Sequence, residues 1–448
     1  MSKLAPFTPQ QLLQTLRQWS QVKRFWIAYS GGLDSHVLLH AIASLRDFLP
    51  GIHLSAIHID HGLSPHSAQW SQHCQNSCAD LGVACRIIKV NAHPTAGESP
   101  EAAARAARYR AFTDIIGKGD CLLTAHHQDD QAETLLLQLI RGSGPAGLAS
   151  MPAYACFGPG SMARPLLAWG REQLWQYGKQ HQLKWVEDQS NFDTGFNRNF
   201  LRHEIMPKLK SRWPSIAKTL SRAAGHQAEA AHLLRQLAQQ DLQEVAAKGD
   251  TLSVSALLRL NDERCRNMLR HWIKSRDLPL PDTSRLDQII SQMLTAPQDA
   301  EPLVHWKGCE VRRYRDALYA MLPLPSHDPV QKLVWVGSEP LVIPDIGILY
   351  GEVTIGTGIN PEFFHHRHIE VGFRVGGEKC RPSGRRPTHA LKKLFQDKGV
   401  PPWQRDRIPL IFIDGNIAAV VGYWICHGYE TAADQPGVTF ILKPNLAQ

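Results

Sequence analysis

The first part of the chain alternates between short apolar runs and longer segments with helical spacing. The apolar runs predict five strands, at Phe25–Tyr29, Leu54–Ile59, Arg86–Val90, Asp120–Thr124 and Lys184–Glu187. The segments between them predict four helices, at His36–Leu45, Ala68–Leu81, Pro100–Ile115 and Asp130–Arg141. Strands separated by helices of this length are typical of a parallel sheet that is covered by helices on both faces. We therefore expect an α/β domain over residues 1–215.

The pattern changes after the Trp213–Pro214 dipeptide. Residues 216–296 follow helical spacing. The positions expected to be buried include Leu233, Leu234, Leu237 and Leu242. A proline-rich stretch over residues 323–329 then predicts a linker, because proline interrupts both helices and strands. We expect a mainly helical middle domain over residues 216–325.

The last part of the chain has the pattern of a small β-rich domain. Its clearest feature is an Asp414–Gly415–Asn416 turn, which predicts a hairpin between the apolar runs Pro409–Ile413 and Ile417–Val421. One helix is expected at His389–Lys398. The sequence therefore predicts a third domain, of α+β type, over residues 330–448.

Composition is that of a packed globular protein. The 448 residues (50.1 kDa) are 43% hydrophobic and 20% charged, and the richest apolar window, Ile408–Ile425, is broken by polar residues. The first ten residues lack a charged start followed by an apolar run, which argues against a secretion signal. Nine scattered cysteines without a C-x-x-C pair argue against a disulfide framework, a zinc finger or an iron–sulfur site. We expect a cytoplasmic protein with no membrane segment.

Positive charge is concentrated near the end of the chain. The formal net charge is +8, and residues 374–407 alone hold ten Lys/Arg against three acids. A second basic segment, residues 198–212, holds five against one. Such concentrations favour a polyanionic partner such as a nucleic acid, although a solvated basic surface is the simpler alternative.

One short segment has the chemistry of a phosphate site. It follows the first strand directly, precedes the first helix, and reads Ser30-Gly31-Gly32-Leu33-Asp34-Ser35. Glycines let the backbone approach an oxyanion, and a helix presents its positive end to that anion. Asp34 is suited to hold Mg²⁺ against phosphate oxygens. No lysine follows the glycines, so this is not a Walker A loop. The alternative is a tight turn that uses glycine for geometry alone.

A second segment follows the fourth strand and reads His126-His127-Gln128-Asp129-Asp130-Gln131-Ala132-Glu133-Thr134. Ligands of parallel sheets bind at this edge. Asp130 and Glu133 are three residues apart and therefore share one helix face. Both carboxylates could reach Mg²⁺ or the amine of a second substrate. A capped helix with solvated acids is the plainer interpretation.

Taken together, these segments resemble those of a known enzyme family. The loop S-G-G-x-D-S is similar to the pyrophosphate loop of the N-type ATP pyrophosphatases. With H-H-x-D-D-Q-x-E-T and the following Arg141-Gly142-Ser143-Gly144, it closely resembles the tRNA(Ile)-lysidine synthases within that superfamily. Further matching stretches are Glu101–Tyr109, Glu187–Asn191, Arg198–Arg202 and the segment from Cys380 to Trp403. The resemblance covers residues 24–214 and about 371–429.

This resemblance implies an N-terminal domain like the adenine-nucleotide hydrolases and a two-step reaction. ATP activates the C2 oxygen of the first anticodon cytidine of a CAU-bearing isoleucine tRNA as an adenylate. The amine of free L-lysine then displaces AMP, giving lysidine, which pairs with adenine instead of guanine. The implied partners are ATP, Mg²⁺, this tRNA and lysine, and a homodimer is left open.

Roles for individual residues follow from the residue chemistry and the resemblance. We expect Asp34 to bind Mg²⁺, Asp130 to bind Mg²⁺ or the amine, Glu133 to bind the amine, and Arg105 to bind phosphate. His58 is expected beside the nucleotide. His58 and Asp60 share a face of the second strand and could form a zinc pair, but no third ligand is evident.

The tRNA-binding residues are expected in the two basic segments. They are Arg198, Arg202, Lys208 and Lys210 in the first, and Arg381, Arg385, Lys392, Lys393 and Arg405 in the second. Trp403 could stack on a base, although a core position is favoured for it. Two other functions stay open at this point: a tRNA thiolase, for which Cys121 and Cys156 sit in no suitable motif, and a non-catalytic ATP-dependent RNA-binding protein.

Overall fold

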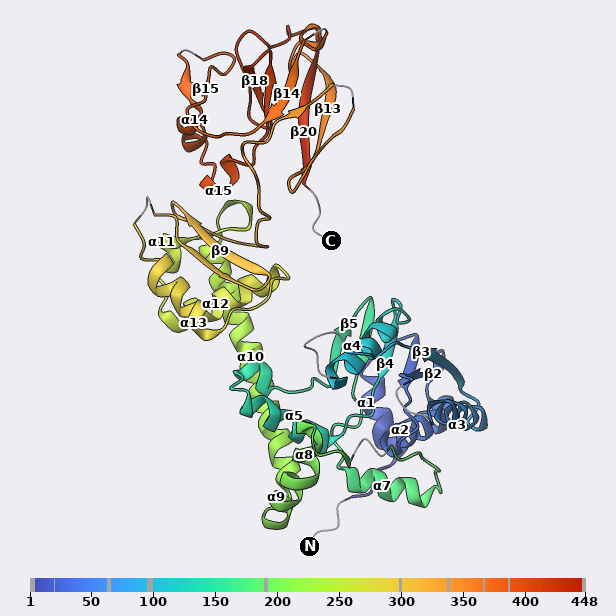
Figure 1. Cartoon of the computed structure of the whole chain (residues 1–448). Coiled ribbons are helices and arrows are strands. Elements are labelled where there is room, and N and C mark those ends of the chain that lie inside the picture. Colours follow the sequence, from blue (N-terminus) through green and yellow to red (C-terminus); the bar gives the residue numbers. More distant parts are fainter. Residues whose placement is uncertain are drawn as a thin grey trace. The chain divides into compact units, whose positions relative to one another are not determined.

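The fold is that of a computed structural model, which describes residues 5–19, 21–62, 66–94, 100–188, 192–297, 300–336, 339–365, 367–385 and 387–444 (Figure 1). It divides into two compact units, residues 1–235 and 236–448. The three domain boundaries expected from sequence remain predictions.

Unit 1 contains an α/β domain. Its strands are β1 (Arg24–Ala28), β2 (His53–Asp60), β3 (Ala84–Lys89), β4 (Asp120–Leu123), β5 (Tyr154–Phe157) and β6 (Gly160–Ala163). Its helices are α1 (Pro9–Arg17), α2 (Leu33–Ser44), α3 (Ser67–Asp80), α4 (Pro100–Thr113), α5 (Gln128–Ile140), α6 (Pro145–Leu148), α7 (Arg171–Gln180), α8 (Asn197–Phe200) and α9 (Met206–Arg212), with short turns η1 (Arg46–Phe48) and η3 (Leu201–Ile205). α10 (Ile216–Val245) begins in this unit.

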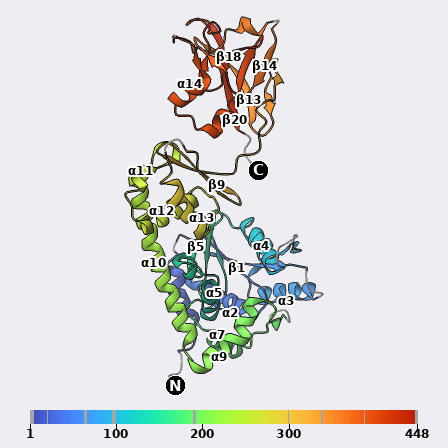
Figure 2. The same ribbon diagram turned by 60° about the vertical axis from the view of Figure 1, so that its left-hand side comes forward.

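The six strands form one sheet in the order β3-β2-β1-β4-β6-β5, and only β5 runs antiparallel to its neighbour. One apolar core joins α1, α2, α3 and α7 to one face, and a second core packs α4 on the other. Figures 1 and 2 show α4 on the opposite side of the strands from α2 and α7. The expected α/β sheet with helices on both faces is confirmed.

Four of the five predicted strands and all four predicted helices are present, with ends shifted by a few residues. The fifth predicted strand, Lys184–Glu187, is wrong: this segment is irregular, and the Val186 N–H donates to the Gly31 carbonyl oxygen at 2.9 Å. Its backbone therefore pairs with the phosphate loop instead of with the sheet. The neighbouring residues 189–191, part of one matching motif, lie outside the described residues.

Unit 2 begins with a helical region that also carries a small sheet. Its helices are α11 (Val254–Leu257), α12 (Asp262–Ser275) and α13 (Thr283–Gln288), with η4 (Lys248–Asp250) and η5 (Ile289–Met293). The sheet is formed by β7 (Leu252–Ser253), β8 (Leu303–Trp306), β9 (Cys309–Tyr314) and β10 (Ala317–Met321), in the order β7-β10-β9-β8. The helical pattern is confirmed, but this sheet was not predicted. Leu233 and Leu234 are exposed, contrary to expectation.

The rest of unit 2 is β-rich, as expected. Its strands are β11 (Leu333–Val334), β12 (Leu341–Ile343), β13 (Gly347–Ile355), β14 (Ile369–Gly372), β15 (Lys379–Cys380), β16 (His389–Ala390), β17 (Leu410–Ile413), β18 (Asn416–Val420), β19 (Trp424–Ile425) and β20 (Pro436–Pro444). Three short helical elements accompany them: η6 (Pro361–Phe364), α14 (Leu391–Asp397) and α15 (Pro402–Arg405). The predicted hairpin is formed by β17 and β18, with positive φ at Asp414 and Gly415.

All nine cysteines are free thiols. Cys85 is half-buried, Cys156 on β5 is exposed, and the other seven are buried, which is the behaviour of small apolar core residues. Within the described part of the chain, no helix is both long enough and apolar enough to cross a lipid bilayer.

Candidate active site

The predicted phosphate loop joins β1 to α2 at the carboxyl edge of the sheet. Gly31 has a φ of +84°, in the left-handed region that favours glycine, and a Cβ there would lie 3.1 Å from the Cys74 sulfur. The hydroxyl oxygens of Ser30 and Ser35 lie 3.0 Å apart, and Ser35 donates to the Gly32 carbonyl oxygen. The loop therefore places its own N–H groups and the amino end of α2 together, which suits an oxyanion.

Asp34 lies in the first turn of α2, beside this loop. Its Oδ1 is buried and has no hydrogen-bond partner in the described chain, whereas Oδ2 lies 3.6 Å from Nε2 of His127. A free carboxylate oxygen beside a phosphate loop is the kind of ligand that Mg²⁺ takes. No cluster of three or more His, Cys, Asp or Glu side chains in the described residues could hold a metal alone. Asp34 thus fits a magnesium ion that phosphate oxygens also bind.

His127 links the loop to the acids of the second segment. It directly precedes α5, and its Nε2 lies 3.4 Å from Asp130 Oδ2, while Nδ1 lies 3.7 Å from Asp129 Oδ2. Burial disfavours the imidazolium, but the carboxylates of Asp130, Asp34 and Asp129 outweigh burial and raise the pKa of His127 to about 9. This side chain is therefore a buried cation among three acids.

Two arginines bind the acids of α5. Arg198 donates to Asp130 at 2.9 Å and to Glu133 at 3.1 Å, and Arg202 donates to the same two carboxylates at 2.8 Å. Burial would raise the pKa of Asp130, but His127 and the two arginines hold it below its usual range. Lys210 likewise pairs with Asp129. Arg198, Arg202 and Lys210 therefore belong to this acid cluster, and both Lys208 and Lys210 are exposed.

Acids and bases balance in this cluster. Its acids are Asp34, Asp129, Asp130 and Glu133, and its bases are His127, Arg198, Arg202 and Lys210. The cluster consequently carries no net charge when His127 is protonated. Both oxygens of Asp130 are engaged, by the arginines and by the His127 backbone N–H. Both arginines bind Oδ1 of Asp130, so an incoming ammonium or Mg²⁺ would compete with them for that oxygen.

The predicted residues of β2 and α4 lie at the same edge. His58 is buried, and its Nδ1 lies 2.9 Å from the Tyr29 carbonyl oxygen, while Asp60 accepts from the Gly62 N–H. These internal partners give no support to a zinc pair. Arg105 is exposed, stacks over the Tyr109 ring at 4.8 Å and donates to its hydroxyl at 3.3 Å.

The C-terminal basic residues divide into two groups. Arg385, Lys392 and Lys393 are exposed, and Arg381 is half-buried with its Nε donating to the Arg385 carbonyl oxygen. Lys392 and Lys393 lie on α14, and Arg381 and Arg385 lie in the connection between the paired strands β15 and β16 that precedes it; we call these four residues the α14 patch. An exposed basic patch is compatible with phosphate contacts.

Arg405 is a correction to this set. It is buried, and its guanidinium donates to the Val400 carbonyl oxygen and to the Tyr314 hydroxyl. We therefore assign it a packing role and remove it from the predicted tRNA surface. Trp403 is half-buried, with its ring edge-on to Tyr319 at 5.3 Å. This packing supports the core interpretation over base stacking.

Two residues of this edge of the sheet were missed from the sequence. The first is His127 as a cation, although two acids follow it closely in the same motif, which was a usable signal. The second is Arg164, which is buried directly after β6. Its only signal was a charged residue at the carboxyl end of an apolar run, and that run was not recognised as a strand.

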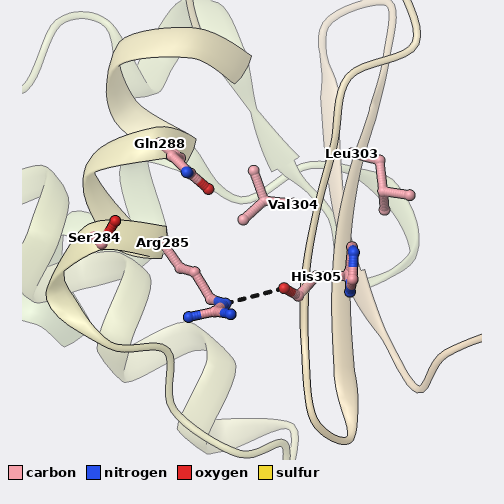
Figure 3. A pocket seen from close by; sticks show the side chains of 6 residues that line it. All are labelled: Ser284, Arg285, Gln288, Leu303, Val304 and His305. Atoms are coloured by element: carbon pink, nitrogen blue, oxygen red, sulfur yellow. Dashed lines mark hydrogen bonds between the residues drawn. The ribbon is translucent and has the colours of Figure 1, made fainter.

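Away from this edge, unit 2 has a cavity of about 370 Å³ between α13 and β8. Figure 3 shows its six lining residues, Ser284, Arg285, Gln288, Leu303, Val304 and His305. The Arg285 Nε donates to the His305 carbonyl oxygen at 3.0 Å, as drawn there. None of these six residues was predicted as a site residue.

Comparison with known proteins agrees with this geometry. The family model for the PP-loop domain matches residues 6–209, that for the TilS substrate binding domain matches residues 252–319, and that for the TilS substrate C-terminal domain matches residues 369–442. A phosphate loop at the edge of a parallel sheet, within a PP-loop domain, defines an ATP-using enzyme of the PP-loop class.

Full-length relatives specify the family. The tRNA(Ile)-lysidine synthase of Coxiella burnetii is 44% identical over 98% of this chain and 97% of its own length. That of Methylococcus capsulatus is 42% identical over 93% of this chain and 96% of its own. Among solved structures, the U34-tRNA thiolase NcsA of Methanococcus maripaludis matches with 16% identity and a TM-score of 0.43, over 49% of this chain and 77% of that chain. The chain belongs to the tRNA(Ile)-lysidine synthase family.

Proposed function

We propose that this chain uses ATP and Mg²⁺ to join L-lysine to C2 of the first anticodon cytidine of a CAU-bearing tRNA(Ile). The products are lysidine, AMP and pyrophosphate, and the edit changes codon reading from AUG to AUA and amino-acid identity from methionine to isoleucine. The observation that carries this proposal is the arrangement of a phosphate loop and an acid cluster around one buried histidine, in a chain of this family. The expected compartment is the cytoplasm.

The first step forms an adenylate. The cytidine C2 oxygen attacks the α-phosphorus of ATP, and pyrophosphate leaves. In this proposal the N–H groups of the Ser30–Ser35 loop and the amino end of α2 bind the departing pyrophosphate. Mg²⁺, held by Asp34 and the phosphates, would offset phosphate charge. Arg105 is the residue we expect nearest to the phosphate.

The second step joins the amine to the ring. A neutral lysine amine attacks C2, AMP leaves with its electron pair, and the amine loses a proton. The acids Asp130 and Glu133 suit the incoming ammonium, because both are buried carboxylates that share one face of α5. Since Arg198 and Arg202 occupy these carboxylates, the proposal includes an exchange in which the arginines turn toward phosphate while the amine enters.

The thiolase alternative finds no support in the cysteines. Cys121 is buried within β4, and burial raises the pKa of its thiol to about 11, so little thiolate forms at neutral pH. Cys156 is exposed on β5. Neither is part of the acid cluster described above.

One assay separates the three candidate functions. The full-length protein is incubated with ATP, Mg²⁺, labelled lysine and either tRNA(Ile) bearing CAU or the same tRNA with a U at the first anticodon position. We expect label in the first RNA alone, with one AMP and one pyrophosphate formed per lysine. ADP as product, or ATP-dependent tRNA binding without label, would contradict the proposal.

A further inference from the structure

Arg164 is a buried cation that the acid cluster does not use. It directly follows β6 and is 8% exposed. Its Nη1 donates to the Pro152 carbonyl oxygen at 2.8 Å, its Nη2 contacts the Met162 sulfur at 3.2 Å, and its Nε is buried without a partner. Within the described ranges, no carboxylate forms an ion pair with it. The carbonyl oxygen and the thioether sulfur carry no formal negative charge, so the positive charge of the guanidinium stays uncompensated.

The contrast with Arg202 shows how unusual this is. The carboxylates of Glu133 and Asp130 outweigh burial and raise the pKa of Arg202. For Arg164, burial lowers the pKa of the guanidinium, and only the Tyr109 hydroxyl opposes it appreciably. A buried charge without a counter-ion is strongly destabilising, as is the breaking of a buried ion pair. Such a group is expected where a ligand supplies the missing charge.

A second arginine, Arg105, contacts the same tyrosine as Arg164 and is exposed to solvent. Tyr109 of α4 interacts with Arg164, and its hydroxyl also accepts a hydrogen bond from Arg105. Arg105 is exposed, and no acid of the described chain pairs with it. Nearby His126 adds no further positive charge, because burial lowers its pKa to about 3 and it is neutral. An anion can therefore approach from the Arg105 side.

The position of these arginines matches one substrate of the proposed reaction. The phosphate loop follows β1, the acid cluster follows β4, and Arg164 follows β6, and these are three adjacent strands. A zwitterion whose ammonium lies at the acids would direct its carboxylate toward the next strand. Lysine has this charge pattern, with its side-chain amine separated from its carboxylate by a methylene chain.

We propose that Arg164, together with Arg105, forms an oxyanion-binding subsite at the carboxyl end of β6. Its ligand is the carboxylate of the amine substrate or, with the same chemistry, the α-phosphate of the nucleotide. The carboxylate is favoured by the acids on the neighbouring strand. This inference rests on the proposed function, because it concerns how the enzyme recognises its amine substrate.

The test compares lysine with cadaverine, which is lysine without its carboxylate. Full-length wild type, Arg164→Met, Arg164→Lys and the control Arg110→Met, an exposed arginine of the same helix as Tyr109, are assayed with each labelled amine and with varied ATP. Losing a hydrogen bond between charged groups corresponds to about a 10- to 100-fold change. We expect Arg164→Met to raise the KM for lysine by this factor and to lose the preference for lysine over cadaverine. The KM for ATP should stay unchanged, Arg164→Lys should recover part of the preference, and Arg110→Met should behave as wild type.

The other outcomes are equally informative. A raised KM for ATP with an unchanged lysine-to-cadaverine ratio assigns the subsite to the α-phosphate. Unchanged KM values for both substrates, or a loss of thermal stability alone, would overturn the subsite. If Arg164→Met does not fold, Arg105→Met must show the same loss of preference for lysine over cadaverine; its KM for ATP is left out of this comparison, because Arg105 is also expected near the phosphate. A wild type that labels tRNA with neither amine would instead refute the proposed function itself.

Discussion

At the scale of single residues, Asp34 gives the sharpest prediction. One carboxylate oxygen is buried without a partner, and the side chain is 32% exposed and packs into no apolar core. We expect Asp34→Ala to abolish AMP formation while changing the free energy of unfolding by less than about 1 kcal/mol. Product analysis and thermal melting of the same samples measure both. A parallel fall in melting temperature and activity would point to a structural role.

At Asp130, a single substitution is expected to affect both lysine transfer and the stability of the fold. Asp130→Asn should abolish lysine transfer, keep most of the tRNA affinity, and cost about 3 kcal/mol of stability, because Arg198 and Arg202 lose a buried partner. Urea unfolding and tRNA binding measure the two quantities. Asp406→Asn is the matched control, since its half-exposed pair with Arg374 should contribute less than about 1 kcal/mol. A collapse of tRNA affinity with normal turnover per bound tRNA would refute the assigned role.

The sequence could indicate which residue types gather at the site but not how they pair. The loop and the acids were predicted because short motifs carry their chemistry. Arg198 and Arg202 were expected to contact tRNA, because an arginine in the sequence gives no sign of whether its side chain faces solvent or pairs with an acid. Their partners lie 65 to 72 residues away in the chain, so only the folded structure reveals the pairs. Arg405 was misread for the same reason.

At the scale of elements, long periodic segments were predicted well and short ones were not. β5 and β6 are four residues each and are separated by a glycine–proline turn, so they lacked a recognisable pattern. Lys184–Glu187 has the alternation of a strand, but its backbone pairs with the phosphate loop. The sheet of the middle region was missed because helical spacing dominates around it.

The phosphate loop allows a matched pair of glycine substitutions. At Gly31 the backbone is left-handed and a Cβ would press on the Cys74 sulfur, whereas at Gly32 φ is −76° and the closest contact is 3.5 Å. Gly31→Ala should therefore cost about 1–2 kcal/mol and raise the KM for ATP, while Gly32→Ala should cost distinctly less stability. Thermal melting and ATP kinetics decide this. Equal destabilisation by both variants would mean that the loop is not held as described.

At the scale of the whole molecule, the α14 patch predicts how tRNA affinity responds to salt. Each phosphate contact contributes about 0.7 to 0.9 to the slope of log affinity against log salt. Replacing Arg385, Lys392 and Lys393 by glutamine in the full chain should flatten this slope by about 2 and weaken all tRNAs alike, because phosphate contacts carry no sequence information. Binding of the CAU-bearing tRNA(Ile) across a salt series measures it. An unchanged slope would leave the patch a solvated surface.

Because most thiols of this protein are buried, the number of thiols that react with a reagent measures whether the chain is folded. Of nine cysteines, Cys156 is the exposed one, Cys85 is half-buried and the other seven are buried. An alkylating reagent must reach the thiol, so a mild reagent should label Cys156 first in the native protein and all nine after denaturation. Counting labelled thiols by mass spectrometry would then show, variant by variant, whether lost activity reflects lost chemistry or a lost fold.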